Sequence, residues 1–259
     1  MPVKFTNRPS LIAYLTSGDP DLDTTREVAL AAVSAGAEVI ELGVPFSDPV
    51  ADGKVIQRAS ERALRNRVAL GDVLKLAREI RRETKAGLII FSYLNPILRM
   101  GVAEFAARAA EAGADGALIT DLPGEEAGEY LRQMRRRHLE TVFLAAPTST
   151  DERLERIAEE STGFVYAVSR TGVTGARKEL PDDAQKLVRR LRKFTPLPIA
   201  VGFGISTPEQ FASLGQFADA AVIGSAIVGI IESSPGKEAQ AVAKFIEQVV
   251  GRHSSVAGR

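Results

Sequence analysis

The chain has 259 residues, of which 45% are hydrophobic and 25% are charged, and its 33 basic residues equal its 33 acidic ones. This composition is typical of a globular protein, and the charge balance excludes a general attraction to nucleic acid or to an anionic membrane. There is no Cys, which excludes disulfides, thiol nucleophiles and cysteine-ligated metals. No stretch approaches the ~18 apolar residues of a membrane span. Residues 1–5 lack the apolar core of a signal peptide, so we expect a cytoplasmic protein.

Short apolar segments alternate with amphipathic segments along the chain. The apolar segments have the pattern of buried strands and cover residues 11–15, 39–42, 87–92, 116–119, 141–145, 164–168, 199–202 and 220–223. The amphipathic segments predict helices at residues 24–35, 55–65, 73–84, 103–112, 127–137, 151–160, 182–192 and 208–214, and a last helix at 238–250. The sequence therefore predicts eight strand–helix units in succession.

Repeated alternation of strands and helices requires a parallel sheet with right-handed crossovers, which is either an open doubly wound sheet or a closed barrel. Eight units favour the barrel. We therefore expect an α/β fold, a single-domain (β/α)8 TIM barrel over residues 1–259. We also expect extra short helices, such as an apolar one that starts at Ser225, and a frayed tail at residues 251–259.

A carboxylate, Glu41, interrupts the second apolar segment. Burying an unpaired carboxylate is costly, and two more acids, Asp48 and Asp52, follow in the next loop. Active sites of α/β barrels lie at the carboxyl ends of the strands, so we predict that Glu41 is catalytic. The alternative is a structural acid that is satisfied by backbone donors or by Tyr166.

Other nucleophiles and bases are missing from the predicted strand ends. His138 lies at a helix end, where a positive charge suits the helix dipole, and His253 lies in the tail. Without histidine or lysine at the strand ends, we expect no imidazole catalysis, no metal site and no Schiff base, so carboxylates are the expected acid and base. The polar side chains at the strand ends are Glu41, Asp48, Asp52, Tyr93, Asn95, Asp121, Thr148, Tyr166, Ser169 and Arg170.

Glycines follow the last two predicted strands, as Gly202-Phe203-Gly204 and as Gly224-Ser225. Glycines let backbone N–H groups approach an anion, and the loops after strands seven and eight are the usual phosphate site of a barrel. We predict a phosphorylated substrate, with simple tight turns as the alternative. Residues 169–177 are polar and rich in glycine, which indicates either a lid over the site or an ordinary surface loop.

Six motifs together resemble the tryptophan synthase alpha chain family. They are residues 41–53 with Gln57, and residues 93–96, 121–123, 169–175, 202–205 and 224–226. The resemblance implies a lyase that cleaves indole-3-glycerol phosphate to indole and glyceraldehyde 3-phosphate, the alpha reaction of L-tryptophan biosynthesis. It also implies a partner beta chain that carries pyridoxal phosphate, an alpha2-beta2 heterotetramer, and no cofactor in this chain.

The same resemblance implies roles for single residues. Glu41 would be the acid and base, Asp52 would accept the indole N–H, and Tyr166 would orient Glu41. The other implied residues are Tyr14, Tyr93, Thr174 and Phe203 for the substrate, Gly175, Gly204, Gly224 and Ser225 for its phosphate, and Asp48 and Pro49 for the partner.

The chain departs from the family pattern in two places. Only ten residues precede the first predicted strand, so the bottom of the barrel is expected to close differently, and Lys54 stands where the family usually has proline. Two other interpretations stay open: another phosphate-binding barrel isomerase or synthase, and a catalytically weak subunit that acts mainly as an allosteric partner. The first usually needs a catalytic lysine or different strand-end acids.

Overall fold

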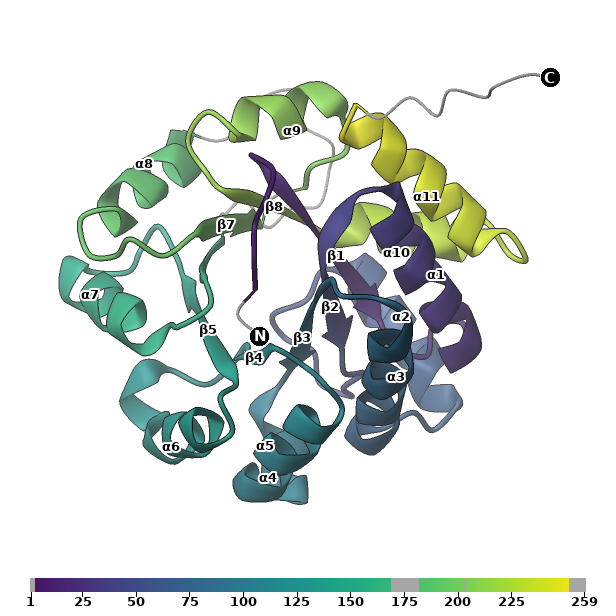
Figure 1. Ribbon diagram of the computed structural model, residues 1–259, viewed down its shortest axis with the longest axis horizontal. Coiled ribbons are helices and arrows are strands. Elements are labelled where there is room, and N and C mark those ends of the chain that lie inside the picture. The colour runs from purple at the N-terminus through teal and green to yellow at the C-terminus, as the bar shows by residue number, and fades with distance from the viewer. Residues whose placement is uncertain (1–2, 169–181, 203, 252–259) are drawn as a thin grey trace.

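In the computed structural model, which describes residues 3–168, 182–202 and 204–251, eight parallel strands close into a barrel in chain order (Figure 1). The last strand pairs with the first, where Val222 lies opposite Ile12. This closure confirms the predicted TIM barrel. The strands are β1 (Ser10–Thr16), β2 (Ala37–Gly43), β3 (Gly87–Ser92), β4 (Gly116–Ile119), β5 (Glu140–Ala145), β6 (Val165–Val168), β7 (Ile199–Gly202) and β8 (Ala220–Ile223).

Helices surround the ring of strands (Figure 1). They are α1 (Leu22–Ala35), α2 (Lys54–Arg65), α3 (Leu70–Glu83), α4 (Leu94–Met100), α5 (Val102–Glu111), the 3-10 helix η1 (Gly124–Glu126), α6 (Gly128–Arg136), α7 (Asp151–Glu160), α8 (Asp182–Leu191), α9 (Pro208–Leu214), α10 (Ser225–Ser233) and α11 (Glu238–Val249). Every predicted strand and helix is confirmed, with ends that shift by a few residues. Of the extra short helices, α10 starts at Ser225 as expected, and the structure adds α4 and η1.

Some helices start earlier than predicted, because a capping hydrogen bond, and not the apolar periodicity, determines their first residue. The Asp21 carboxylate accepts a hydrogen bond from the Thr24 N–H at 2.7 Å, so α1 starts earlier than its periodic part. At α3 the Asp72 carboxylate accepts from the Ala69 N–H at 3.3 Å. The pattern does not predict α4, because Pro96 resembles a helix breaker. A proline in the first turn removes no helical hydrogen bond, so α4 tolerates it.

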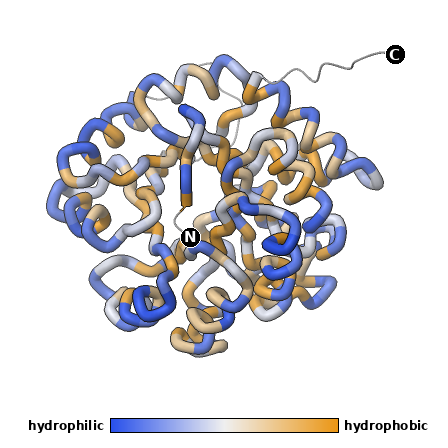
Figure 2. The backbone as a smooth tube through the Cα atoms, in the orientation of Figure 1, coloured by the Kyte–Doolittle hydropathy of each residue, from blue (hydrophilic) through white to orange (hydrophobic). Residues whose placement is uncertain are grey.

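The strands bury two separate apolar layers. Their inner faces fill the barrel with Ile12, Val39, Ile89, Leu118, Val142, Phe164, Ala200, Ala220 and Val222. Their outer faces, including Leu11, Ile40 and Leu88, pack against the helices. Figure 2 shows hydrophilic positions on the outward sides of the helices. The barrel interior is therefore a packed apolar core, and a carboxyl group inside it requires an explanation.

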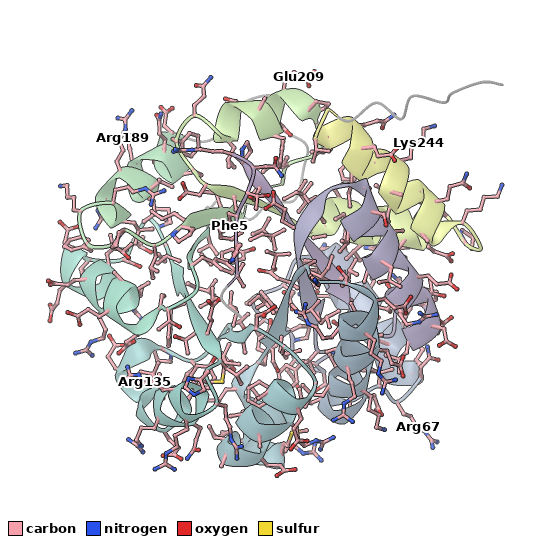
Figure 3. The ribbon with its side chains drawn as sticks, viewed as in Figure 1. Phe5, Arg67, Arg135, Arg189, Glu209 and Lys244 are labelled. Atoms are coloured by element: carbon pink, nitrogen blue, oxygen red, sulfur yellow. The ribbon has the colours of Figure 1, made fainter. Side chains whose placement is uncertain are left out.

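The residues before β1 cover the amino-terminal end of the barrel. The Phe5 ring meets the Phe164 ring edge-on, with centroids 5.7 Å apart. In Figure 3 Phe5 lies in the middle of the ring of strands. The charged side chains at the rim of the same view point outwards, and those labelled are Arg67, Arg135, Arg189, Glu209 and Lys244. Phe5 thus closes the bottom of the interior layer.

Two glutamates hold this initial segment in place. The Val3 N–H donates to the two Glu140 carboxylate oxygens at 3.2 and 3.3 Å. The N–H groups of Thr6 and Asn7 donate to the Glu38 carboxylate at 2.6 and 3.0 Å. Because Glu38 belongs to β2 and Glu140 to β5, the segment is attached to separate parts of the ring. Within the described residues, no helix is both long and apolar enough to cross a membrane.

Candidate active site

Glu41 points into the barrel from β2, near the carboxyl end of the strand. In the parallel pairing it lies opposite Tyr14 of β1 and Ile89 of β3. Alternate strand residues share a face, so it points the same way as Val39, which belongs to the interior apolar layer. The residue is fully buried, with 0% of its surface exposed. The fold thus places an acid inside the core, at the end where barrels build their sites.

Burial is the main influence on the Glu41 carboxyl. Neither of its oxygens has a hydrogen-bond partner among the residues that the structure describes, so neither a backbone donor nor Tyr166 satisfies it there. Burial raises the pKa of Glu41 to about 8, so the carboxyl is mainly protonated at neutral pH. A neutral carboxyl without a protein partner can give its proton to a ligand.

The loop between β2 and α2 folds back to present Asp52. The Asp52 N–H donates to the Pro49 carbonyl at 3.0 Å. The Gln57 side-chain amide, in the first turn of α2, donates to the Asp52 carbonyl at 2.8 Å. Phe46 of the same loop stacks on Tyr93, with ring centroids 4.9 Å apart. The loop is therefore attached both to α2 and to the residue that precedes α4.

A hydrogen bond from Tyr93 controls the Asp52 carboxylate. The Tyr93 hydroxyl donates to Asp52 Oδ2 at 3.0 Å and accepts from the Ala51 N–H at 3.0 Å. Burial raises the pKa of Asp52 to about 6, although the Tyr93 bond lowers it, so Asp52 is mainly ionised at neutral pH. Burial and the Asp52 charge also raise the pKa of Tyr93. The resemblance implied that Tyr93 contacts the substrate. No local sequence pattern indicates its hydrogen bond to Asp52, which lies 41 positions earlier.

Tyr14 and Phe91 form an aromatic wall beside the two acids. The Tyr14 ring is buried and meets the Phe91 ring edge-on, with centroids 5.1 Å apart. Burial, and then the Asp52 charge, raises the pKa of Tyr14. A Cβ at Gly43 would come 2.3 Å from the Tyr14 hydroxyl, so only glycine leaves room for this ring. The motifs did not identify Phe91, but its place two residues after Ile89 on an inward strand face could have done so.

Tyr166 enters the same space from β6. Burial, and then the Glu41 charge, raises its pKa well above the ordinary value, so the two side chains are near enough to interact. A Cβ at Gly202 would come within 2.5 Å of the Tyr166 ring, so this glycine makes room for the ring. The structure thus brings Glu41, Tyr14 and Tyr166 together from three strands.

Three of the four predicted phosphate residues, Gly204, Gly224 and Ser225, lie after β7 and β8. Gly224 is the N-cap of α10, its carbonyl accepts from the Val228 N–H at 3.0 Å, and Ser225 is the first residue of the helix. A Cβ at Gly204 would meet no atom of the described residues within 4 Å. The first N–H groups of a helix lack partners within the helix and suit an anion.

Three predicted site residues lie outside the described residues, and they are Thr174, Gly175 and Phe203. The same is true of the expected lid at 169–177, with its Ser169 and Arg170, and of His253. Their roles stay predictions. Within the described ranges, no group of three His, Asp or Glu side chains is placed to hold a metal.

The outer side of the Asp52 loop faces solvent. Asp48 is exposed and Pro49 is partly buried. Val50, at 88% exposure, and Leu98 of α4, at 57%, are the large hydrophobic side chains most exposed in the described part of the chain. The loop is bonded to Tyr93, the residue before α4, so both segments belong to one rim of the barrel.

The chain matches known proteins over nearly its whole length. A family model described as the tryptophan synthase alpha chain matches residues 2–257. The tryptophan synthase alpha chain of Solibacter usitatus is 54% identical, over 90% of this chain and 87% of the relative. The chain belongs to the tryptophan synthase alpha chain family.

Further members of the tryptophan synthase alpha chain family agree with this assignment. That of Thermococcus kodakarensis is 50% identical, over 87% of this chain and 90% of the relative. A solved tryptophan synthase complex from Pyrococcus furiosus includes a chain with 42% identity and a TM-score of 0.88, covering 94% of this chain and 98% of that one. The comparisons confirm the family that the six motifs indicated.

Proposed function

We propose that this chain is a lyase that cleaves indole-3-glycerol phosphate to indole and glyceraldehyde 3-phosphate, the alpha reaction of L-tryptophan biosynthesis. Its membership of the tryptophan synthase alpha chain family supports the reaction. The observation that carries the mechanism is the buried Glu41 carboxyl, which has no hydrogen-bond partner in the described part of the chain and is mainly protonated at neutral pH. The reaction needs a proton at indole C3, a base for a side-chain hydroxyl, and stabilisation of the ring nitrogen.

Two carboxyls supply these needs. Glu41 donates its proton to indole C3, and positive charge develops at the ring nitrogen. The ionised Asp52 accepts the ring N–H and stabilises this charge. The Glu41 carboxylate then removes the proton of the hydroxyl next to C3. An aldehyde forms, and the electrons of the broken carbon–carbon bond restore the aromatic indole. Glu41 ends protonated, so the cycle is balanced.

The remaining residues hold the substrate. We assign the aromatic wall of Tyr14 and Phe91 to the indole ring, because its edge-on pair offers an apolar surface. Phe203, Tyr93 and Thr174 are assigned to the substrate by resemblance, as is Tyr166 to the orientation of Glu41. Gly204, Gly224 and Ser225 at the start of α10 are assigned to the phosphate, together with Gly175.

The test is indole release from indole-3-glycerol phosphate by Glu41→Gln. Loss of the acid should lower kcat by at least ~10²-fold while KM changes little, because the amide keeps the shape but has no acidic proton. Glu38→Gln is the matched control, since Glu38 lies on the same strand but contacts the initial segment. Near wild-type release by Glu41→Gln would overturn the mechanism.

We also propose a beta chain with bound pyridoxal phosphate as partner, in an alpha2-beta2 assembly in the cytoplasm, with no cofactor in this chain. The exposed Asp48, Val50 and Leu98, with the partly buried Pro49, support a docking surface on this rim. The same surface favours one alternative, a weak subunit that mainly activates its partner. Assays with and without a beta chain separate the two, and no indole in either would overturn the lyase function.

A further inference from the structure

Outside the active site, an ionic network links two helices that begin at the site. Glu232, near the end of α10, accepts hydrogen bonds from Arg58 Nε at 2.9 Å and Arg58 Nη2 at 2.6 Å. It also accepts from Arg62 Nη1 at 2.7 Å. Both arginines lie on α2, one turn apart. One carboxylate therefore accepts three charge-assisted bonds from the neighbouring helix, two of them from one guanidinium, although the Arg58 and Glu232 side chains are 49% and 31% exposed.

The network continues to the loop after β1. Arg62 Nε and Nη2 donate to the two Asp19 oxygens at 2.7 and 2.8 Å. The Asp19 side chain is only 2% exposed, so this bidentate pair anchors the far end of the network in the protein. A bidentate pair to a buried carboxylate has a single favourable geometry, unlike a solvent-exposed surface pair.

Each connected element carries or adjoins a residue of the proposed site. The Asp52 carbonyl is bonded to Gln57 in the first turn of α2 at 2.8 Å. The helix α10 begins at Ser225, and β1 carries Tyr14. On the inner side of the same helices, Ala59 of α2 and Val228 of α10 pack with Tyr14 in one apolar cluster. A shift of α2 against α10 would thus move the indole end of the site relative to its phosphate end.

We propose that Glu232 is a positioning residue, which holds α2 against α10 and so sets the spacing between the Asp52 carboxylate and the phosphate site at Gly224 and Ser225. The inference rests on the proposed function, since this spacing matters only for a substrate that spans both ends. Glu232 itself touches no reacting atom. Small displacements of a bound substrate, on the order of 1 Å, cost up to ~10²-fold in rate.

The test compares Glu232→Gln and Glu232→Ala with the control Glu83→Gln. Glu83 of α3 pairs with Arg26 of α1, so the control also breaks an ion pair between two helices, but neither helix carries a proposed site residue. We expect kcat/KM for indole-3-glycerol phosphate to fall roughly 10- to 100-fold in Glu232→Ala, and less in Glu232→Gln, which keeps one accepting oxygen. The control should match the wild type.

The discriminating measurement uses the two halves of the substrate, indole and glycerol 3-phosphate, as separate ligands. If Glu232 only sets the spacing between the indole end and the phosphate end of the site, each half should bind the variants with a Kd within about twofold of the wild-type value. Only a ligand that occupies both ends is affected by their separation. The variants should also unfold at the same temperature as Glu83→Gln. If Glu232→Ala does not fold, Glu232→Gln carries the comparison.

Two results would overturn the inference. One is unchanged kcat/KM in both Glu232 variants. The other is a parallel loss of affinity for both half-ligands, which indicates a purely structural role. The wild-type chain tests the proposed function separately. If that function is wrong, the wild type releases no indole from indole-3-glycerol phosphate, whatever the variants do.

Discussion

At the scale of single residues, the site distinguishes two carboxyls by their surroundings. Glu41 is enclosed in the apolar barrel with no partner among the described residues, and its pKa is raised to about 8. Asp52 is held by the Tyr93 hydroxyl, and its pKa is raised only to about 6. Different environments therefore make one carboxyl a proton donor and the other an anion at the same pH.

The pH dependence of cleavage follows from these two values. The active form has Asp52 ionised and Glu41 protonated, so kcat/KM should be highest between pH values of about 6 and about 8. It should fall at lower pH as Asp52 gains a proton and at higher pH as Glu41 loses one. The pH profile of indole release measures both the fall at low pH and the fall at high pH. A flat profile from about pH 5 to about pH 9 would contradict the roles given to Asp52 and Glu41.

Tyr93→Phe is the control for the acidic limb. The Tyr93 bond lowers the pKa of Asp52, so its removal should move that limb to higher pH. The alkaline limb belongs to Glu41 and should stay in place.

At the scale of elements, the two ends of the barrel have separate tasks. The loop after β2 and the starts of α2 and α10 carry the proposed chemistry at the carboxyl ends of the strands. The segment before β1 closes the other end through Phe5 and through bonds to Glu38 and Glu140. Barrels commonly separate activity and stability in this way.

Phe5→Ala tests this separation. The change removes a partly buried ring from the interior layer, so the free energy of unfolding should fall by about 2 kcal/mol, less than for a fully buried phenylalanine. Denaturant titration measures the loss. Indole release at 25 °C should stay near wild type, and Phe5→Leu, which keeps most of the apolar volume, should lose less stability. A large loss of kcat in a folded Phe5→Ala chain would show that the two ends are not independent.

At the scale of the whole molecule, the buried carboxyl of Glu41 makes the stability of the fold depend on pH. We infer one domain, because β1 pairs with β8 and the interior layer is shared by all eight strands. A carboxyl whose pKa is raised on folding contributes its full stability below its unfolded pKa. That contribution is lost as pH rises through the folded value, here about 8 for Glu41.

Glu41→Gln should therefore be more stable than the wild type at alkaline pH. The advantage should grow as pH rises from that of an ordinary glutamate to about 8, and then level off at a few kcal/mol, since each pKa unit corresponds to about 1.4 kcal/mol. Unfolding free energies of both chains across this range measure it. Glu140 also has a raised pKa, but it is common to both chains and cancels in the difference. If the difference in unfolding free energy between the two chains does not change with pH, folding does not raise the pKa of Glu41.

The sequence by itself determined the order of strands and helices, the eight-unit barrel, the family and the position of Glu41 at a strand end. Those features depend on short-range patterns, namely the period of two in strands, the period near 3.6 in helices, and motifs within single loops. These patterns do not predict the helix α4, because proline breaks the interior of a helix but is tolerated in its first turn, where Pro96 lies.

Only the tertiary structure decided how these residues act on one another. The Tyr93 bond to Asp52 joins positions 41 apart, and the Arg58 bond to Glu232 joins positions 174 apart, so neither has a local signal. The glycine at position 43 is explained only by the Tyr14 ring across the neighbouring strand. The protonation of Glu41 depends on how much water the closed barrel excludes, and that is a property of the complete ring of strands.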